Sequence, residues 1–159
     1  HPFPAPLHFS YSQHRPSTET YESDKRSVYL MQRRLDKHPF LGLFDGADPT
    51  TATGLRSVSA SPMQALFHLN SEFSEEQAAT LATRLLKEVP DNPEARVESA
   101  WLRIYGRSPS RDESAIALAF LDQTTAVWRD SEDGNAAEHA AWTSLARTLF
   151  SSNSFAFVN

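Results

Sequence analysis

Apolar residues recur every three to four positions through most of the second half of the chain, a spacing that predicts amphipathic helices. The first of these helices is expected to begin at Pro62, because proline suits the first helical position, and to continue through Leu69. The second carries its apolar positions between Ala78 and Val89. Ser74 and Gln77 lie ahead of that run at the spacing of a capping box.

The same signals predict three further boundaries. Pro93 is expected to open a third helix and Gly106 to end it. A second capping box, Ser110 with Glu113, begins a fourth helix, whose broad apolar face is expected to contain Ile116, Ala117, Phe120, Leu121 and Trp128. Residues 131–135 are predicted to form a turn before a last helix with apolar positions between Ala141 and Phe150. Residues 154–159 are expected to form an extended tail.

The first sixty residues are less regular. Residues 1–25 are rich in Pro, Ser, Thr and Tyr, and four of the ten prolines fall in the first sixteen positions, so we expect an extended arm. Residues 26–36 have helical spacing, with a strand as the alternative; 38–44 suggest a short helix and 45–55 a loop. The predicted fold is all-α: a single domain over residues 1–159, with a Pro-rich arm (1–25), a helix and loop (26–60) and an amphipathic helical bundle (61–159).

Charge is divided unevenly along the chain. Residues 1–60 hold 7 basic and 6 acidic side chains, a net +1, whereas residues 61–159 hold 8 basic and 14 acidic, a net −6. The total of −5 makes a nucleic-acid partner unexpected. An acidic helical half beside a near-neutral irregular half suggests surfaces for different partners.

The absence of cysteine limits the chemistry of this segment. With 0 Cys among its 159 residues, the segment cannot form disulfides, zinc–thiolate sites or a covalent c-type haem attachment. The sequence has no apolar run of about 18 residues, so no membrane span is expected. The chain begins at His1, and we interpret it as a fragment of a longer polypeptide. No cofactor and no metal site are expected within it.

A basic cluster is the main candidate for binding. Lys25, Arg26, Arg33, Arg34 and Lys37 fall within thirteen positions, and on a helix several of them would share a face. Such a face could bind an acidic partner, a sulfated glycan or haem propionates, or could pair internally with the domain's carboxylates. Arg56 is the fourth candidate binding arginine, with capping of carbonyls or pairing with Asp45 or Asp48 as its structural alternative.

Other polar residues have simpler explanations. Asp45 and Asp48 flank Gly46 as in part of a calcium loop, but threonines follow where a further acidic ligand would be needed. A turn held by Asx hydrogen bonds is therefore expected there. His38, His68 and His139 are expected to be packed or solvent-facing rings rather than metal ligands.

Five segments then carry a family resemblance. They are KRSVYL (25–30), FDGADPT (44–50), RSVSASPMQALFHLNSEF (56–73), WLRIYGRSPSRDE (101–113) and AWTSLARTLFSSNSFAFVN (141–159). Together they resemble the C-terminal domain of unknown function of planctomycete-type cytochrome c domain proteins. Ser154 departs from the pattern, since the resemblance leads us to expect Glu in the closing motif.

The resemblance implies an exported, extracytoplasmic multidomain protein with haem c elsewhere in the polypeptide. It implies other domains of that polypeptide as partners, with a cytochrome or a polysaccharide as further candidates; it brings no catalytic residues. We therefore expect a non-catalytic scaffold or interaction module. The shared residues Tyr29, Gln64, Asn70, Asn153 and Phe155, with Arg26 and Arg56, would mainly hold loops and helix ends. The alternative is a module of an extracytoplasmic hydrolase or polysaccharide-processing enzyme.

Overall fold

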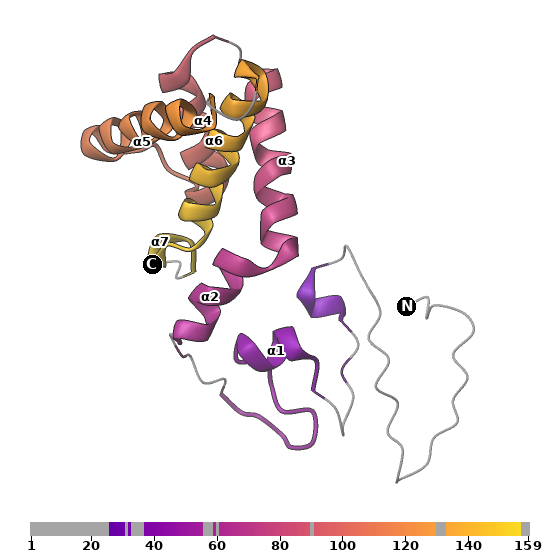
Figure 1. Cartoon of the computed structure of the whole chain (residues 1–159). Helices are drawn as coiled ribbons and strands as arrows, with labels where there is room; N and C mark the ends of the chain where they lie inside the picture. The colour runs from indigo at the N-terminus through magenta and orange to yellow at the C-terminus, as the bar shows by residue number, and fades with distance from the viewer. Residues whose placement is uncertain are drawn as a thin grey trace. The chain divides into compact units, whose positions relative to one another are not determined.

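The computed structural model describes residues 26–30, 32, 37–55, 59, 61–89, 91–129 and 133–156. The chain divides into two compact units, His1–Ser61 and Pro62–Asn159. Every regular element of the described residues is helical, which confirms the all-α prediction (Figure 1). The predicted arm over residues 1–25 and the end of the predicted extended tail, residues 157–159, lie outside the described residues.

The first unit begins, in its described part, with a short 3₁₀ helix η1, Ser27–Tyr29. The predicted helix over residues 26–36 is wrong here, because Leu30 is already extended, with φ −65° and ψ 139°. Val28 is 76% exposed, so it does not provide the buried face that stabilises a short amphipathic helix in water. Residues 31 and 33–36 lie outside the description.

The predicted short helix and loop of the first unit are confirmed. Helix α1, Pro39–Leu43, is followed by turns and bends through residue 55. Asp48 Oδ1 accepts hydrogen bonds from the Thr50 amide at 2.8 Å and the Thr50 hydroxyl at 2.6 Å, as expected of an Asx turn. These bonds lower the pKa of Asp48. The Asp45 carboxylate accepts from the amide and hydroxyl of Ser59, which ties the two ends of the loop together.

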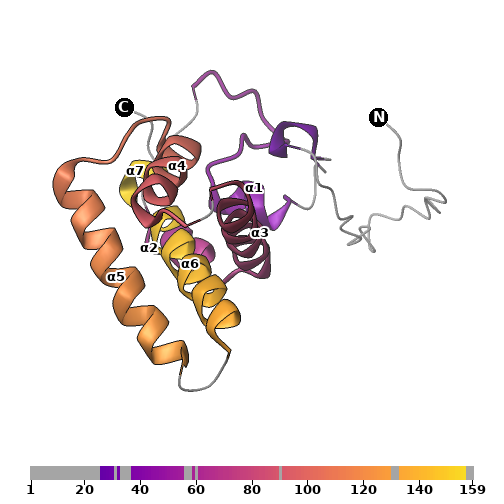
Figure 2. The ribbon, with the colours of Figure 1, turned by 90° about the horizontal axis from the view of Figure 1, so that it is seen from above.

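The described residues of the second unit form six helices. They are α2 (Pro62–Asn70), α3 (Glu72–Glu88), α4 (Pro93–Tyr105), α5 (Arg111–Arg129), α6 (Gly134–Phe150) and α7 (Asn153–Ala156). Helix α6 is central, because it packs most extensively against α3 on one side and α5 on the other (Figures 1 and 2). Helix α4 packs against α5, α3 and α6.

The core of this unit is formed by small and large apolar side chains that interlock between these helices. Ala82 and Leu85 of α3 and Val97 of α4 are essentially inaccessible to solvent. The full buried cluster contains Ala82, Leu85, Val97, Ala100, Trp101, Ala117, Leu121, Ala141, Trp142, Leu145 and Leu149. Alanines at the contact positions let the helix backbones approach closely, and the two tryptophans fill the remaining volume.

Helix α5 buries a narrower face than its sequence predicts. Ala117 and Leu121 are buried, but Ile116 is 70% exposed and Trp128 is 38% exposed. The prediction of one broad apolar face is therefore wrong at Ile116. The residues at 116 and 117 differ by about 100° around a helix, so a helix with neighbours on one side can bury only one of them well.

Two helix starts differ from the predicted ones. The cap of α3 is Ser71, whose hydroxyl accepts from the Ser74 amide at 3.2 Å, so the predicted Ser74–Gln77 box is wrong. Ser71 has the extended backbone of a cap, and Ser74 is already buried inside the helix. Asp133 caps α6 through the Ala136 amide, so Gly134 and Asn135 of the predicted turn are helical.

The chain after α6 is also helical where it is described. Residues 153–156 form α7, so the predicted extended tail is wrong for residues 154–156. The Phe155 ring packs against Phe150, with ring centroids 5.2 Å apart, and meets His68 edge-on at 5.6 Å. This packing against α6 and α2 is a tertiary contact, which the local sequence does not reveal.

The remaining boundary signals are confirmed. Pro62 and Pro93 occupy the first positions of α2 and α4. Gly106 ends α4 in the left-handed conformation, with φ 71°, which glycine adopts without strain. Ser110 and Glu113 form the predicted capping box, in which each side chain bonds to the other residue's amide.

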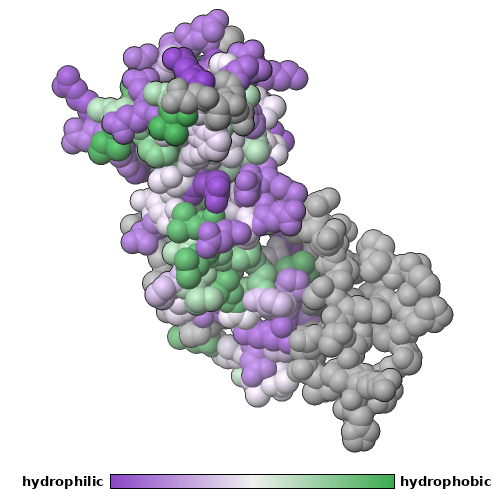
Figure 3. Space-filling view, in the orientation of Figure 1, coloured by the Kyte–Doolittle hydropathy of each residue, from purple (hydrophilic) through white to green (hydrophobic). Residues whose placement is uncertain are grey.

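The surface of the second unit mixes polar and apolar regions. Figure 3 shows apolar surface gathered over α2 and α7. Met63, Leu66 and Leu69 of α2 are all substantially exposed. Among the described residues, no helix combines the length and apolar character needed to cross a membrane.

Candidate functional site

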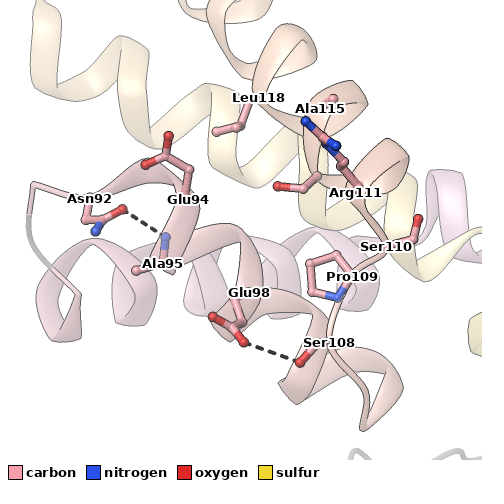
Figure 4. Close-up of a pocket in the computed structure, with 11 residues that line it drawn as sticks. Asn92, Glu94, Ala95, Glu98, Ser108, Pro109, Ser110, Arg111, Ala115 and Leu118 are labelled. Carbon is pink, nitrogen blue, oxygen red and sulfur yellow. Dashed lines mark hydrogen bonds between the residues drawn. The ribbon is translucent and has the colours of Figure 1, made fainter.

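An open hollow between α4 and α5 is a candidate site in the second unit (Figure 4). Its volume is about 620 Å³, within the range of small-ligand sites. One wall is the first half of α4, the opposite wall is the first half of α5, and the loop between these helices closes one end. The lining consists of Asn92, Glu94, Ala95, Glu98, Ser108, Pro109, Ser110, Arg111, Ser114, Ala115 and Leu118.

Two carboxylates of α4 give the hollow its charge. Glu94 and Glu98 are one helical turn apart, so both lie on the face of α4 that borders the hollow. Glu98 accepts a hydrogen bond of 3.3 Å from the Ser108 hydroxyl across the hollow. Neither carboxylate forms an ion pair with a described residue. Their charge therefore remains available to a positively charged group entering from solvent.

The loop that closes the hollow is held by the cap of α5. Arg107 donates two hydrogen bonds to the Glu113 carboxylate, at 2.8 and 2.6 Å, in the fork geometry typical of Arg–carboxylate pairs. Glu113 also accepts from the Ser110 amide at 2.7 Å. The bond from Arg107 is the main reason that the pKa of Glu113 is lowered to about 2. The loop therefore presents Ser108, Pro109 and Ser110 in a fixed conformation.

The start of α4 is fixed equally firmly. The Asn92 side chain caps the helix by accepting from the Ala95 amide at 3.0 Å. Arg96, buried in the next turn, donates to the Val89 carbonyl and pairs with Glu138 of α6. Three segments are thus joined at one guanidinium: the end of α3, the start of α4 and the first half of α6. Glu94 and Glu98 flank Arg96 in sequence, so this junction also positions them.

The chemistry of the hollow suits binding of a polar or cationic group. Carboxylates accept hydrogen bonds and positive charge, and serine hydroxyls both donate and accept. Arg111 lies on the α5 wall and would orient a ligand that carries both signs of charge. Within the described residues, no group of three or more His, Asp or Glu side chains could hold a metal ion.

The predicted binding arginines are mostly outside the described part of the chain. Arg26 is exposed and precedes η1, where its carbonyl accepts from the Tyr29 amide at 2.8 Å. Arg33, Arg34 and Arg56 lie outside the described residues. Their joint binding face stays a prediction. Lys37, from the same cluster, donates to the Gly46 carbonyl at 2.6 Å and so stabilises the loop after α1.

The predicted structural residues have different surroundings. Gln64 is buried in α2, whereas Asn70 at the end of the same helix is exposed. Tyr29 is 55% exposed. Asn153 begins α7, and Phe155 in that helix joins the aromatic contact with Phe150 and His68 described above. Burial of the His68 ring lowers its pKa.

Sequence reasoning missed the α4–α5 hollow. It placed Ser110 at a helix start but gave no role to Glu94, Glu98 or Ser108. The available signal was the spacing of Glu94 and Glu98 by four residues on the polar face of a helix, followed by a short Ser-Pro-Ser loop. That signal is weak, because such pairs are common on solvent-facing helices.

Comparison with known proteins gives one family. Residues 4–121 match the family PSD1, described as a protein of unknown function (DUF1553). No curated protein and no solved structure matches the chain. The family match includes the whole of α2, α3 and α4 and the first half of α5, and therefore both walls of the hollow. Since the match extends over well more than half of the 159 residues, the chain belongs to the PSD1 (DUF1553) family of proteins of unknown function.

Proposed function

We propose that the chain is a non-catalytic interaction module of a longer, exported cytochrome c-type protein. The observation that carries this proposal is the pair of carboxylates, Glu94 and Glu98, facing an open hollow between two firmly fixed helix ends. Three other carboxylates of the second unit, Glu88, Glu113 and Glu138, are instead paired with arginines.

The partner of this surface would be a basic region of another domain in the same polypeptide. The second unit carries most of the negative charge of the chain, a net −6 over residues 61–159, so it would attract a basic partner before contact is made. Lysine or arginine side chains of the partner could then enter the hollow and bind Glu94 and Glu98. A haem-bearing cytochrome segment with a basic surface is the candidate partner.

The location and the host protein belong to the same proposal. The sequence resemblance to planctomycete-type cytochrome c domain proteins supports an extracytoplasmic location and a haem c group outside this segment. A reading frame that contains a signal peptide and a Cys-x-x-Cys-His motif ahead of His1 would agree with it. A frame without either would remove the support for the cytochrome partner.

Salt-dependent binding tests the proposal. The upstream part of the polypeptide would be produced separately and titrated with residues 1–159 at about 20 mM and about 300 mM salt, because screening weakens exposed ionic contacts. Binding should weaken strongly at the higher salt and in the double variant Glu94→Gln, Glu98→Gln. The double variant Glu75→Gln, Glu76→Gln removes the same charge from exposed positions of α3 and should bind almost as wild type. Equal losses in both variants would contradict a role for the hollow.

A further inference from the structure

A second, smaller hollow lies where α3, α4 and α6 meet. Its volume is about 320 Å³, and it is lined by Gln77, Leu81 and Arg84 of α3, Arg103 of α4 and Phe150 of α6. This volume is at the lower end of the range for small-molecule sites. The lining combines two guanidinium groups with an apolar wall, which differs from the acidic lining of the α4–α5 hollow.

Arg103 is held in one orientation by its neighbours. Its Nη2 group is paired with the Glu88 carboxylate at the end of α3, and its Nε donates to the Ser99 hydroxyl at 3.2 Å. The bonds to described residues leave its Nη1 group uncommitted. Fixing the guanidinium in advance reduces the entropy that would be lost when a ligand binds to it.

Arg84 is the uncommitted cation of this hollow. Within the described part of the chain it forms no hydrogen bond and no ion pair, although its charge acts on Glu88 one turn along α3. The two arginines and Glu88 together carry a net charge of +1. A positive site is unusual in this unit, whose net charge is −6.

The apolar side of the hollow is formed by Leu81 and Phe150. Both side chains are half-buried, so each presents part of its surface to the hollow. The Phe150 ring is also in contact with Phe155, which limits its movement. The Gln77 amide adds a group that can donate or accept a hydrogen bond.

We propose that this hollow binds a small aromatic oxyanion. Its carboxylate, sulfate or phosphate group would lie between Arg84 and Arg103, because guanidinium groups match the geometry of such oxyanions. Its ring would pack against Leu81 and Phe150, where burial of apolar surface adds to the binding free energy. The small volume restricts the ligand to about one ring with its substituent.

Titration of residues 1–159 with phenyl phosphate, monitored by amide chemical shifts, tests the proposal. Saturable shifts should be concentrated in residues 77–84 and around Arg103 and Phe150. Inorganic phosphate, which has no ring, should bind at least about threefold more weakly, and phenol, which has no charge, should give no saturable shift.

Two matched variants separate this site from general charge attraction. Arg84→Gln should weaken the binding of phenyl phosphate about tenfold, the loss of one charge-assisted contact. Lys87→Gln removes the same charge from α3 at an exposed position outside the lining and should change binding less than about twofold. Melting curves check that both variants remain folded.

Three results would overturn the proposal. Shifts that do not saturate, or that spread over the whole unit, would show that no specific site exists. Equal weakening by the two variants would show attraction to α3 in general. Binding of inorganic phosphate as strong as that of phenyl phosphate would remove the aromatic part of the assignment.

Discussion

Arg96 and Glu138 form an ion pair in which only the arginine is buried. The Arg96 side chain is 7% exposed and the Glu138 side chain 41%, with 2.5 Å between Nη1 and Oε1. Arg96 also donates to the Val89 carbonyl through Nε. The guanidinium thus satisfies a carbonyl at the end of α3 while its charge is balanced by a carboxylate that still reaches solvent.

Removal of Glu138 should destabilise the second unit. In Glu138→Gln the buried guanidinium loses its compensating charge but keeps its bond to Val89, so we expect a decrease of about 1–3 kcal/mol in the free energy of unfolding. Urea denaturation, monitored by circular dichroism, measures this free energy of unfolding. Glu88→Gln, which breaks the exposed Arg103 pair, is the matched control and should lower the free energy of unfolding clearly less than Glu138→Gln does. If both variants lost the same free energy, burial of Arg96 would have no special role.

Gln64 and Asn70 should differ, although the sequence alone assigned both to structural roles. Gln64 is 9% exposed, so Gln64→Ala should lower the free energy of unfolding by about 1–3 kcal/mol. Asn70 is exposed at the end of α2, so Asn70→Ala should change it by less than about 0.5 kcal/mol. Thermal melting of the two variants measures this difference. An Asn70→Ala variant less stable than Gln64→Ala would contradict the burial of Gln64 and the exposure of Asn70.

Glu113 should make stability depend on pH in the acidic range. Its pKa is lowered to about 2 in the folded chain from an ordinary value of 4.5. The folded form therefore binds fewer protons than the unfolded form between these values, and the contribution of Glu113 is lost as pH falls from about 4.5 to about 2. The effect should be about 0.5–1 kcal/mol, because the side chain is 34% exposed.

The variant Glu113→Gln should flatten this part of the stability curve. Asp112→Asn, in the same turn of α5, removes an equal charge and serves as the control. Urea midpoints measured from pH 5 to pH 2 give the comparison. If the dependence of the urea midpoint on pH were the same in Glu113→Gln as in the wild type, the contact between Arg107 and Glu113 could not be the cause of that dependence.

His68 should produce a second pH dependence, near neutrality. Burial lowers its pKa below the ordinary 6.5, so the unfolded chain takes up a proton at a higher pH than the folded chain does. Stability should therefore fall as the pH drops below about 6.5, and α7 should loosen, because Phe155 packs on the His68 ring. An NMR titration that follows the ring protons of His68 measures its pKa directly. A pKa at or above 6.5 would contradict the effect of burial.

The sequence predicts this fold well where the signal is local. Pro62, Pro93 and Gly106 set helix boundaries through their own backbone constraints, and the Ser110–Glu113 box needs only residues three apart. The prediction failed where tertiary contacts decide. Helix α7 depends on contacts of Phe155 with residues of α6 and α2, and Ile116 is exposed because of where the neighbours of α5 lie.

The candidate sites were less accessible to sequence reasoning for the same reason. The α4–α5 hollow joins residues 92–98 to residues 108–118, and the smaller hollow joins Arg84 to Phe150. Such combinations appear only when helix packing is known. The burial of Arg96 is also invisible in the sequence, since arginine normally marks a solvated face.

The most direct test of the proposed docking surface is hydrogen–deuterium exchange on the intact polypeptide. Exchange of residues 92–98 and 108–118 would be compared between the isolated chain and the full-length protein. The account predicts slower exchange of these two segments in the full-length protein at low salt, with the difference reduced at high salt. Identical exchange in both forms would contradict docking at the α4–α5 hollow.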